Sequence, residues 1–381
     1  MPGCNRAAIF HFLRRKPCPE AAVEGHDPAD RAAPELPLGS GTASGESAGI
    51  TYFNPLANPG FVFDIASDAA GNAWFTASNV IGRLTPAGVV TLFEVPTVDG
   101  GSAGGAYITA GPDGNMWFTS GSGSLGRITP SGSFSFFLPD GALSFFELVT
   151  GGDGNLWFDE PPSGRVAKMT APGKVTEFDV GARQPRALIP LKDAMAVGPN
   201  GDVWFADALD GRDVPRLAKR SAADGSAQSF REARYASIAV DSTNNAWFVG
   251  TAVDLPETLT VGRVDDVTGG VALYAANCPG SMPSSAVDHH GVIATGAGNA
   301  VWFTESRGAT LGRIDTATLQ ATCFHAFGND PTFGSGAYPE RIAPAPNGSV
   351  WFIETAFISP FGGFPGGSAG PVAIGIGHLV P

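Results

Sequence analysis

The only adjacent pair among the six histidines of the chain is His289 and His290, in the stretch DHHG. A neutral imidazole is the natural proton acceptor or metal ligand near neutral pH. Two glutamates follow, Glu340 in YPER and Glu354 in WFIET. An imidazole nitrogen and two carboxylates that converge to within about 6 Å of one point could take up a proton or hold a metal ion. Whether these side chains converge depends on the elements that position them.

A repeated unit predicts those elements. Every Trp is followed directly by Phe, and successive copies are 40 to 55 residues apart. The tryptophans are Trp74, Trp117, Trp157, Trp204, Trp247, Trp302 and Trp351. Periods of about 40 to 50 residues with four short strands in each are typical of β-propeller blades. Large rings would fill the space between wedge-shaped sheets, so we assign the tryptophans to the core and not to a functional site.

The second copy shows the four strands expected in each blade. AYITAGPDG supplies a first strand and its turn, NMWFTS a second strand, GSLGRITPSG a third and SFSFFLP a fourth. The seventh copy lacks a fourth strand after PVAIGIGHLVP, and ITYF at residues 50–53 matches the missing strand. We therefore predict an all-β fold, a seven-bladed β-propeller of four-stranded antiparallel blades. The N-terminal strand would close the ring by pairing with the last blade, which removes an open sheet edge.

The first 48 residues differ from the rest of the chain. They are rich in Ala, Pro, Gly and acidic residues without a strand pattern, so we expect a disordered lead-in at 1–48 and a single propeller at 49–381. The start, MPGCNRAAIFHFLRRKP, places its basic cluster after the apolar residues, the reverse of a secretory signal. Two alternatives follow: a cytoplasmic protein, or a natural start elsewhere and a secreted or periplasmic location.

The formal net charge of −13 argues against nucleic acid as a partner, because an acidic surface repels phosphate backbones. No apolar run approaches the roughly 20 residues of a membrane span. The sequence also has no G-x-S-x-G, P-loop or paired C-x-x-C motif, which leaves serine hydrolase, nucleotide and structural zinc sites without support. We expect a monomer.

Four cysteines leave two alternatives open. Cys278 and Cys323 lie at or near the fourth strands of the fifth and sixth copies, and Cys4 and Cys18 lie in the lead-in. Cys278 and Cys323 could form a disulfide between neighbouring outer edges, which would indicate an oxidising compartment. They could equally be free thiols, because a disulfide needs Cα atoms within roughly 7 Å.

The repeat I-T-x-G-P-D-G-x-x-W-F-T followed by I-G-R-I-T-P-x-G resembles the virginiamycin B lyase family, the streptogramin lyases, over residues 49–381. The resemblance implies a seven-bladed propeller that opens a cyclic depsipeptide by elimination at its ester linkage, with Mg²⁺. A base would remove the proton α to a carbonyl while the metal holds the developing negative charge. The implied site lies at one mouth of the central channel, on the last two blades.

The family pattern has a His just before the penultimate blade. At that place this chain has Gly291, with His289 and His290 immediately before it. By resemblance, His290 is the candidate catalytic base and His289 its neighbouring alternative.

The family pattern also has Glu-Pro-His before the last blade and a Glu after its Trp-Phe pair. This chain has Tyr338-Pro339-Glu340 at the first place, and at the second Glu354 stands one position early. By resemblance, Glu340 and Glu354 are candidate catalytic residues and candidate Mg²⁺ ligands. Arg341, beside Glu340, could bind an anionic substrate group or neutralise an acid.

Acids at equivalent places in other copies support a second interpretation, in which these residues simply line a water-filled channel. Such acids near first strands are Asp64, Glu147 and Asp193, and those at the same offset as Glu354 are Glu160, Asp207 and Glu305. Three classes of function stay open. The protein could be a metal-assisted lyase acting on a cyclic ester, a non-catalytic binding module for a small-molecule or cyclic peptide ligand at the channel, or a protein-interaction propeller.

Overall fold

The computed structural model describes residues 49–55, 62–97, 105–120, 123–137, 147–160, 165–171, 174–179, 195–207, 216–230, 233–252, 255–275, 278, 291–305, 310–325, 337–357 and 371–381. The chain divides into a unit at residues 1–32, which lies outside these ranges, and a unit at residues 33–381, which contains every described strand. The expected disordered lead-in therefore stays a prediction.

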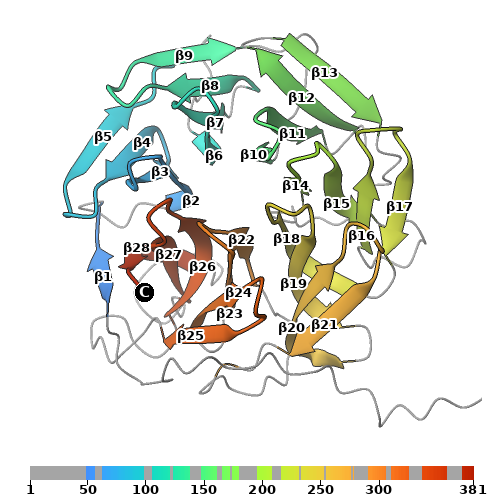
Figure 1. Cartoon of the computed structure of the whole chain (residues 1–381). Coiled ribbons are helices and arrows are strands. Elements are labelled where there is room, and N and C mark those ends of the chain that lie inside the picture. Colours follow the sequence, from blue (N-terminus) through green and yellow to red (C-terminus); the bar gives the residue numbers. More distant parts are fainter. Residues whose placement is uncertain are drawn as a thin grey trace, which may run out of the picture. The chain divides into compact units, whose positions relative to one another are not determined.

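Seven four-stranded antiparallel sheets form a ring around a central channel, as the sequence predicts (Figure 1). The innermost strands are β2 (Val62–Ser67), β6 (Gly105–Ala110), β10 (Leu148–Thr150), β14 (Met195–Val197), β18 (Ala233–Val240), β22 (Ile293–Thr295) and β26 (Ala337–Pro344). The second strands, which carry the Trp-Phe pairs, are β3 (Ala73–Ala77), β7 (Met116–Ser120), β11 (Leu156–Glu160), β15 (Val203–Asp207), β19 (Ala246–Ala252), β23 (Ala300–Glu305) and β27 (Val350–Phe357).

Two further strands complete each blade. The third strands are β4 (Val80–Leu84), β8 (Leu125–Ile128), β12 (Arg165–Ala171), β16 (Arg216–Arg220), β20 (Leu255–Val264), β24 (Thr310–Asp315) and β28 (Pro371–Leu379). The outer strands are β5 (Val90–Glu94), β9 (Phe134–Phe137), β13 (Lys174–Asp179), β17 (Ala227–Phe230), β21 (Val271–Ala275), β25 (Ala321–His325) and, in the last blade, β1 (Ile50–Phe53). Within the described ranges there is no helix, and hence no helical segment that could cross a membrane.

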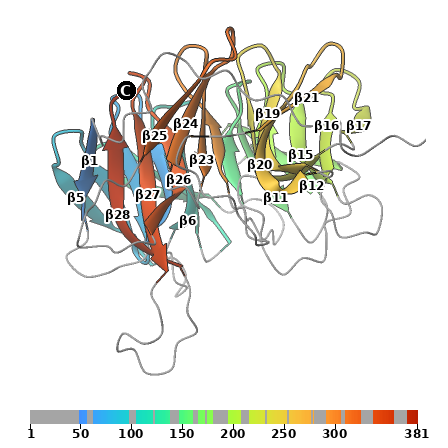
Figure 2. The same cartoon turned by 90° about the horizontal axis from the view of Figure 1, so that it is seen from below.

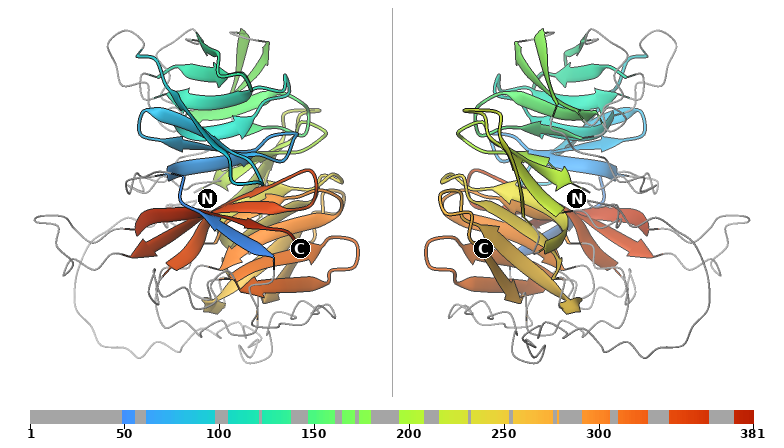
Figure 3. Two further views of the ribbon diagram at one scale, coloured as in Figure 1. Left: turned by 90° about the vertical axis from the view of Figure 1, so that its left-hand side faces the viewer. Right: turned by 90° about the vertical axis from the view of Figure 1, so that its right-hand side faces the viewer.

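The N-terminal strand closes the ring. β1 lies beside β28 and pairs with it antiparallel (Figures 2 and 3). In this pairing Thr51 lies opposite His378. The last blade therefore has the strand order β1-β28-β27-β26, in which the first strand of the chain completes the final sheet. This confirms the predicted closure.

The Trp-Phe pair fills the gaps between blades. Successive side chains of a strand point to opposite faces, so the Trp and the Phe of one blade enter different gaps. Trp74 of blade 1 packs in one buried cluster with Phe118 of blade 2. The same arrangement recurs around the ring until Trp351 of blade 7 packs in one cluster with Phe75 of blade 1. The repeated pair is therefore a core feature, as the sequence analysis assigned it.

The Gly-Arg pair in the third strands of blades 1, 2, 5 and 6 follows from the same packing, and blades 3 and 4 have Ala167-Lys168 and Ala218-Lys219 at these places. Gly82 of β4 lies opposite Phe75, and a Cβ atom on Gly82 would stand 2.0 Å from the Cζ atom of that ring. The next residue, Arg83, places its guanidinium carbon 5.6 Å from the Trp74 ring centroid. In the last blade His378 takes the place of the arginine and stacks on the Trp of its own blade, with 3.9 Å between ring centroids.

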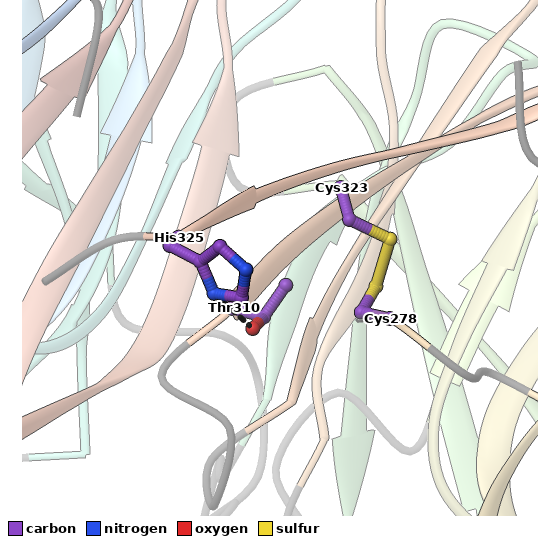
Figure 4. The surroundings of a disulfide bond; sticks show 4 residues. All are labelled: Cys278, Thr310, Cys323 and His325. Atoms are coloured by element: carbon purple, nitrogen blue, oxygen red, sulfur yellow. Dashed lines mark hydrogen bonds between the residues drawn. A yellow bond between two sulfur atoms is a disulfide. The ribbon is translucent and has the colours of Figure 1, made fainter. Parts of the chain in front are cut away.

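A disulfide joins the outer edges of blades 5 and 6. Cys278 follows β21, Cys323 lies on β25, and their Cα atoms are 5.7 Å apart (Figure 4). Of the two alternatives that the sequence left open, the structure has the bonded one.

Candidate functional site

One mouth of the channel is formed where the inner strands begin and the second strands end, because these neighbours are antiparallel. We call it the entry mouth. Six acidic residues with described side chains belong to this end of their blades: Asp64 of β2, Glu147 just before β10, Asp159 of β11, Glu305 at the end of β23, Glu340 of β26 and Glu354 of β27. The entry mouth is thus acidic in blades 1, 3, 6 and 7.

His289 and His290 lie outside the described residues, as does Asp193, so their predicted place at the entry mouth stays a prediction. The described chain resumes at Gly291 and enters β22 two residues later. A Cβ atom at Gly291 would stand 2.9 Å from Cγ2 of Val249 and 3.0 Å from the backbone oxygen of Thr304. A side chain at the position that the family pattern gives to His would therefore require Val249 or the backbone at Thr304 to shift.

Glu340 is the extra residue of a β-bulge in β26, between Pro339 and Arg341. Bulges re-aim side chains and are frequent beside functional sites. The Glu340 side chain is half-buried, and its Oε2 accepts a hydrogen bond of 2.7 Å from the hydroxyl of Thr355 on β27.

Glu354 is 3% exposed and lies against β28, where a Cβ atom on Gly375 would stand 3.8 Å from its Oε2. Glu354 and Thr355 are successive residues of β27, so their side chains point to opposite faces of blade 7. Since Thr355 binds Glu340, the carboxylates of Glu340 and Glu354 approach the blade from opposite faces.

The positions of Glu340 and Glu354 can be compared with what a magnesium ion requires. Mg²⁺ usually binds proteins through one or two carboxylates and keeps several waters, so Glu340 and Glu354 fit it by donor type. A single ion shared by both does not fit side chains on opposite faces of a blade. Within the described part of the chain, no three His, Cys, Asp or Glu side chains come together as a metal-binding group. Magnesium stays a prediction from the resemblance.

Arg341 links the last blade to the first two. It is 4% exposed, and its Nη1 lies 3.6 Å from Oδ1 of Asp64 on β2. Oδ2 of Asp64 also accepts a hydrogen bond of 2.9 Å from the backbone N–H of Ile108 in blade 2. The guanidinium carbon of Arg341 lies 5.8 Å from the ring centroid of Tyr107. These contacts favour a charge-pairing role for Arg341.

Tyr107 marks a point where several charges meet. Burial raises the pKa of its hydroxyl far above the usual value, Arg341 opposes that rise, and the carboxylates of Glu147, Asp64 and Asp159 add to it. The electrostatic environment of this hydroxyl is therefore set by one guanidinium and three carboxylates from blades 1, 3 and 7.

Glu305 stands at the same offset from its Trp-Phe pair as Glu354, and nothing in the sequence singles it out. Burial raises its pKa to about 7. Its Oε2 is buried and makes no hydrogen bond to the described part of the protein. The stretch WFTE resembles the other copies, so the sequence alone does not show that the pKa of Glu305 is raised. Strongly shifted carboxyl groups are enriched at functional sites.

The channel holds a cavity of about 460 Å³ beside the inner strands of blades 3 to 6. Its lining begins at Glu147, where β10 is about to start, and continues past the ends of the inner strands to Gly152, Pro199 and Ser242. The cavity therefore runs along the channel wall and away from the entry mouth.

Together, the fold and the mouth define a seven-bladed β-propeller with an acidic channel entrance. The sequence profile of the Virginiamycin B lyase family matches residues 39–194, which confirms the resemblance inferred from the repeats. The match ends before β14 of blade 4, so it does not include Glu305, Glu340 or Glu354. No curated protein matches the chain in sequence.

Solved structures show the same fold. A streptogramin B lyase structure is 24% identical, with a TM-score of 0.60 over 87% of this chain and 97% of that chain. A catalytically inactive His-to-Ala variant of virginiamycin B lyase from Staphylococcus aureus, with quinupristin, is 21% identical, with a TM-score of 0.60 over 87% and 99%. The WD40 repeats of RRP9 are 10% identical, with a TM-score of 0.61 over 91% and 98%. Because such different proteins align equally well, these likenesses establish the propeller and not an activity.

Proposed function

We propose that the entry mouth at blades 6 and 7 binds a cyclic ester or depsipeptide and opens it by elimination. The observation that carries the proposal is Glu305, a half-buried side chain at the mouth end of blade 6 whose Oε2 is buried and makes no hydrogen bond to the described part of the protein, and whose pKa is raised by burial to about 7. A base with such a pKa combines proton affinity with availability near neutral pH, as proton abstraction requires. The resemblance to the virginiamycin B lyase family supplies the class of substrate.

In the proposed reaction Glu305 accepts the proton from the carbon α to a carbonyl. The electron pair of that C–H bond forms a C=C bond to the neighbouring β carbon. The bond between the β carbon and the ester oxygen breaks, and this oxygen leaves as part of a carboxylate. Glu305 then returns its proton to water. His290, with His289 beside it, is a second proposed proton carrier, and Glu340 and Glu354 are proposed to bind polar groups of the substrate.

The test follows a panel of cyclic depsipeptides and lactones by liquid chromatography and mass spectrometry, with Mg²⁺ and with a chelator. Elimination gives a ring-opened product with the mass of the substrate, whereas hydrolysis adds one water. We expect Glu305→Gln to lower the rate by about 10² or more, the usual contribution of a general base. His290→Ala tests the second proton carrier, and Glu94→Gln on the exposed outer strand is the charge-matched control. A Glu305→Gln variant with the wild-type rate would contradict the role of Glu305.

A second candidate function is ligand binding without turnover. It is favoured by blade 7, where Glu340 and Glu354 lie on opposite faces and so do not act on one atom together. Binding of a panel member without product, in the presence of Mg²⁺, would support this candidate and exclude elimination of that compound.

A further inference from the structure

Tyr107 lies in a β-bulge near the start of β6, the inner strand of blade 2. The pairing of β6 with β7 shifts register between Gly105 and Ile108. Two residues, Ala106 and Tyr107, therefore stand opposite the single residue Thr119. The Thr119 hydroxyl accepts a hydrogen bond of 3.1 Å from the backbone N–H of Tyr107 and so holds the bulge in place. Bulges re-aim side chains and are frequent beside functional sites.

The Tyr107 side chain reaches the central channel. Part of it packs against the core cluster between blades 2 and 3. The guanidinium carbon of Arg341, on β26 of blade 7, lies 5.8 Å from the centroid of the Tyr107 ring. Blades 7 and 2 are not neighbours, because blade 1 stands between them (Figure 1). Side chains of these two blades can therefore meet only on the channel side, so Tyr107 belongs to the entry mouth.

The hydroxyl of Tyr107 is a hydrogen-bond donor that the described part of the protein leaves unused. The side chain is half-buried, and the only hydrogen bond of Tyr107 to side chains of the described residues is the one from its backbone N–H. Burial raises the pKa of the hydroxyl far above its usual value, so the group keeps its proton throughout the physiological pH range. A protonated phenol donates one hydrogen bond. The mouth therefore presents a donor whose state does not change near neutral pH.

The surroundings of this hydroxyl favour a neutral acceptor over an anionic one. Burial is the largest cause that disfavours a negative charge on the hydroxyl oxygen, Arg341 opposes it, and three carboxylates add to it. The same causes would act on an anionic oxygen of a ligand at hydrogen-bond distance. An amide or ester carbonyl oxygen accepts a hydrogen bond without carrying a full charge. No direct contact between a ligand and the carboxylates is required.

We propose that the Tyr107 hydroxyl binds a neutral carbonyl oxygen, from an amide or an ester, of a ligand in the entry mouth. This role rests on the function proposed above, since a cyclic depsipeptide carries both kinds of carbonyl. Tyr107 would hold the ring of the substrate at blade 2 and would take no part in the elimination itself. Tyr107→Phe should therefore raise the KM of any depsipeptide that is turned over by about threefold to tenfold and leave kcat nearly unchanged.

Binding can be measured separately from turnover with three six-membered rings: δ-valerolactam, tetrahydropyran and cyclohexanecarboxylate. The lactam is a neutral amide without an ester bond, so the proposed elimination cannot consume it. Tetrahydropyran lacks the carbonyl group, and cyclohexanecarboxylate carries an anion in its place. We expect the full chain at neutral pH to bind the lactam about threefold or more tightly than tetrahydropyran, and the carboxylate to bind most weakly. Equal affinities for the three rings, no detectable binding of the lactam, or a preference for the carboxylate would overturn the proposal.

Isotope labelling locates the contact. The chain has five tyrosines, so tyrosine labelled with ¹³C at Cζ gives one signal for each, and the signal missing from Tyr107→Phe belongs to Tyr107. That signal should move as δ-valerolactam is added. The affinity for the lactam should fall about threefold to tenfold in Tyr107→Phe. It should stay at the wild-type value in Tyr274→Phe, which removes the hydroxyl of a half-buried tyrosine on the outer strand β21.

The contact at Tyr107 and the elimination can fail separately. A Tyr107 signal that moves with the lactam, in a protein that turns over no member of the depsipeptide panel, would support the contact and count against elimination. Turnover with an unmoved Tyr107 signal and a wild-type KM in Tyr107→Phe would refute the contact and leave elimination standing. If Tyr107→Phe fails to fold, a wild-type titration in which none of the tyrosine signals moves refutes the contact.

Discussion

Glu305 and His378 are side chains whose charged forms are disfavoured by burial. Glu305 makes stability fall as pH rises, and His378 makes it fall as pH drops. Burial raises the pKa of Glu305 to about 7 and lowers the pKa of His378. The unfolded chain releases the Glu305 proton first as pH rises, so stability falls between about 4.5 and about 7. The unfolded chain takes up the His378 proton first as pH falls, so stability also falls below about 6.5.

Replacing Glu305 isolates its part of this pH dependence. The difference between its unfolded pKa of 4.5 and its folded pKa of about 7 corresponds to at most about 3 kcal/mol of lost stability above neutral pH. Glu305→Gln should therefore be more stable than wild type at about pH 8, by up to about 3 kcal/mol, and should lose that advantage near pH 5. Urea denaturation at both pH values measures this, with the exposed Glu94→Gln as control. Parallel curves for wild type and Glu305→Gln would contradict it.

At the scale of the element, the third strands of five blades have Gly opposite the Phe, whereas blades 3 and 4 have Ala167 and Ala218 there. A Cβ atom on Gly126 of β8 would stand 2.1 Å from Cζ of Phe118 on the paired strand. Gly126→Ala should destabilise the protein by about 1 to 3 kcal/mol, the usual cost of overpacking a core. Thermal and urea unfolding measure the loss.

The double variant Gly126→Ala/Phe118→Leu is the matched test of that explanation. If the loss comes from the ring, Gly126→Ala should cost less on the Phe118→Leu background than on the wild type, because the smaller side chain leaves room for the new methyl group. Equal costs on both backgrounds would place the effect in the backbone and not in the Phe118 contact.

The closing strand makes a second prediction at this scale. β1 supplies the outer edge of blade 7, and Tyr52 and Phe53 pack against the core clusters on either side of that blade. Deleting residues 49–56 should therefore destabilise the whole ring and not only shorten it, because β28 would become an unpaired edge. The measurement is the thermal midpoint of the truncated protein, compared with one truncated only at residues 1–48. Equal midpoints would show that closure by β1 is dispensable.

The strands could be predicted from the sequence because each copy repeats the same local packing problem. A Trp and a Phe at successive positions must enter neighbouring gaps, and the Gly that faces the Phe in five of the copies marks the third strand. The candidate site could be predicted only in part. Whether Glu354 shares a face with Glu340 depends on the bulge in β26 and on Thr355, and the pKa of Glu305 depends on burial. No repeat pattern encodes those properties.

At the scale of the whole molecule, the ring is secured by contacts that the repeat does not supply. Beyond the repeated Trp-Phe packing, blade 7 is joined to blade 1 by the pair of Arg341 with Asp64, and blades 5 and 6 are joined at their outer edges by Cys278 and Cys323. A propeller has no central layer to hold its blades, so each of these links acts between neighbours. Of these links, the disulfide is the one that depends on the redox conditions around the protein.

We therefore expect the protein to work in an oxidising compartment, where such a bond persists. In protein folded without reductant, Cys278 and Cys323 should resist alkylation and should appear in one cross-linked peptide on digestion. Cys278→Ser/Cys323→Ser should lower the free energy of unfolding by roughly 2 to 4 kcal/mol, and added reductant should lower the stability of wild type to a similar level without affecting the double variant. Ready alkylation of both cysteines in unreduced, folded protein would contradict the bond and remove the argument for an oxidising compartment.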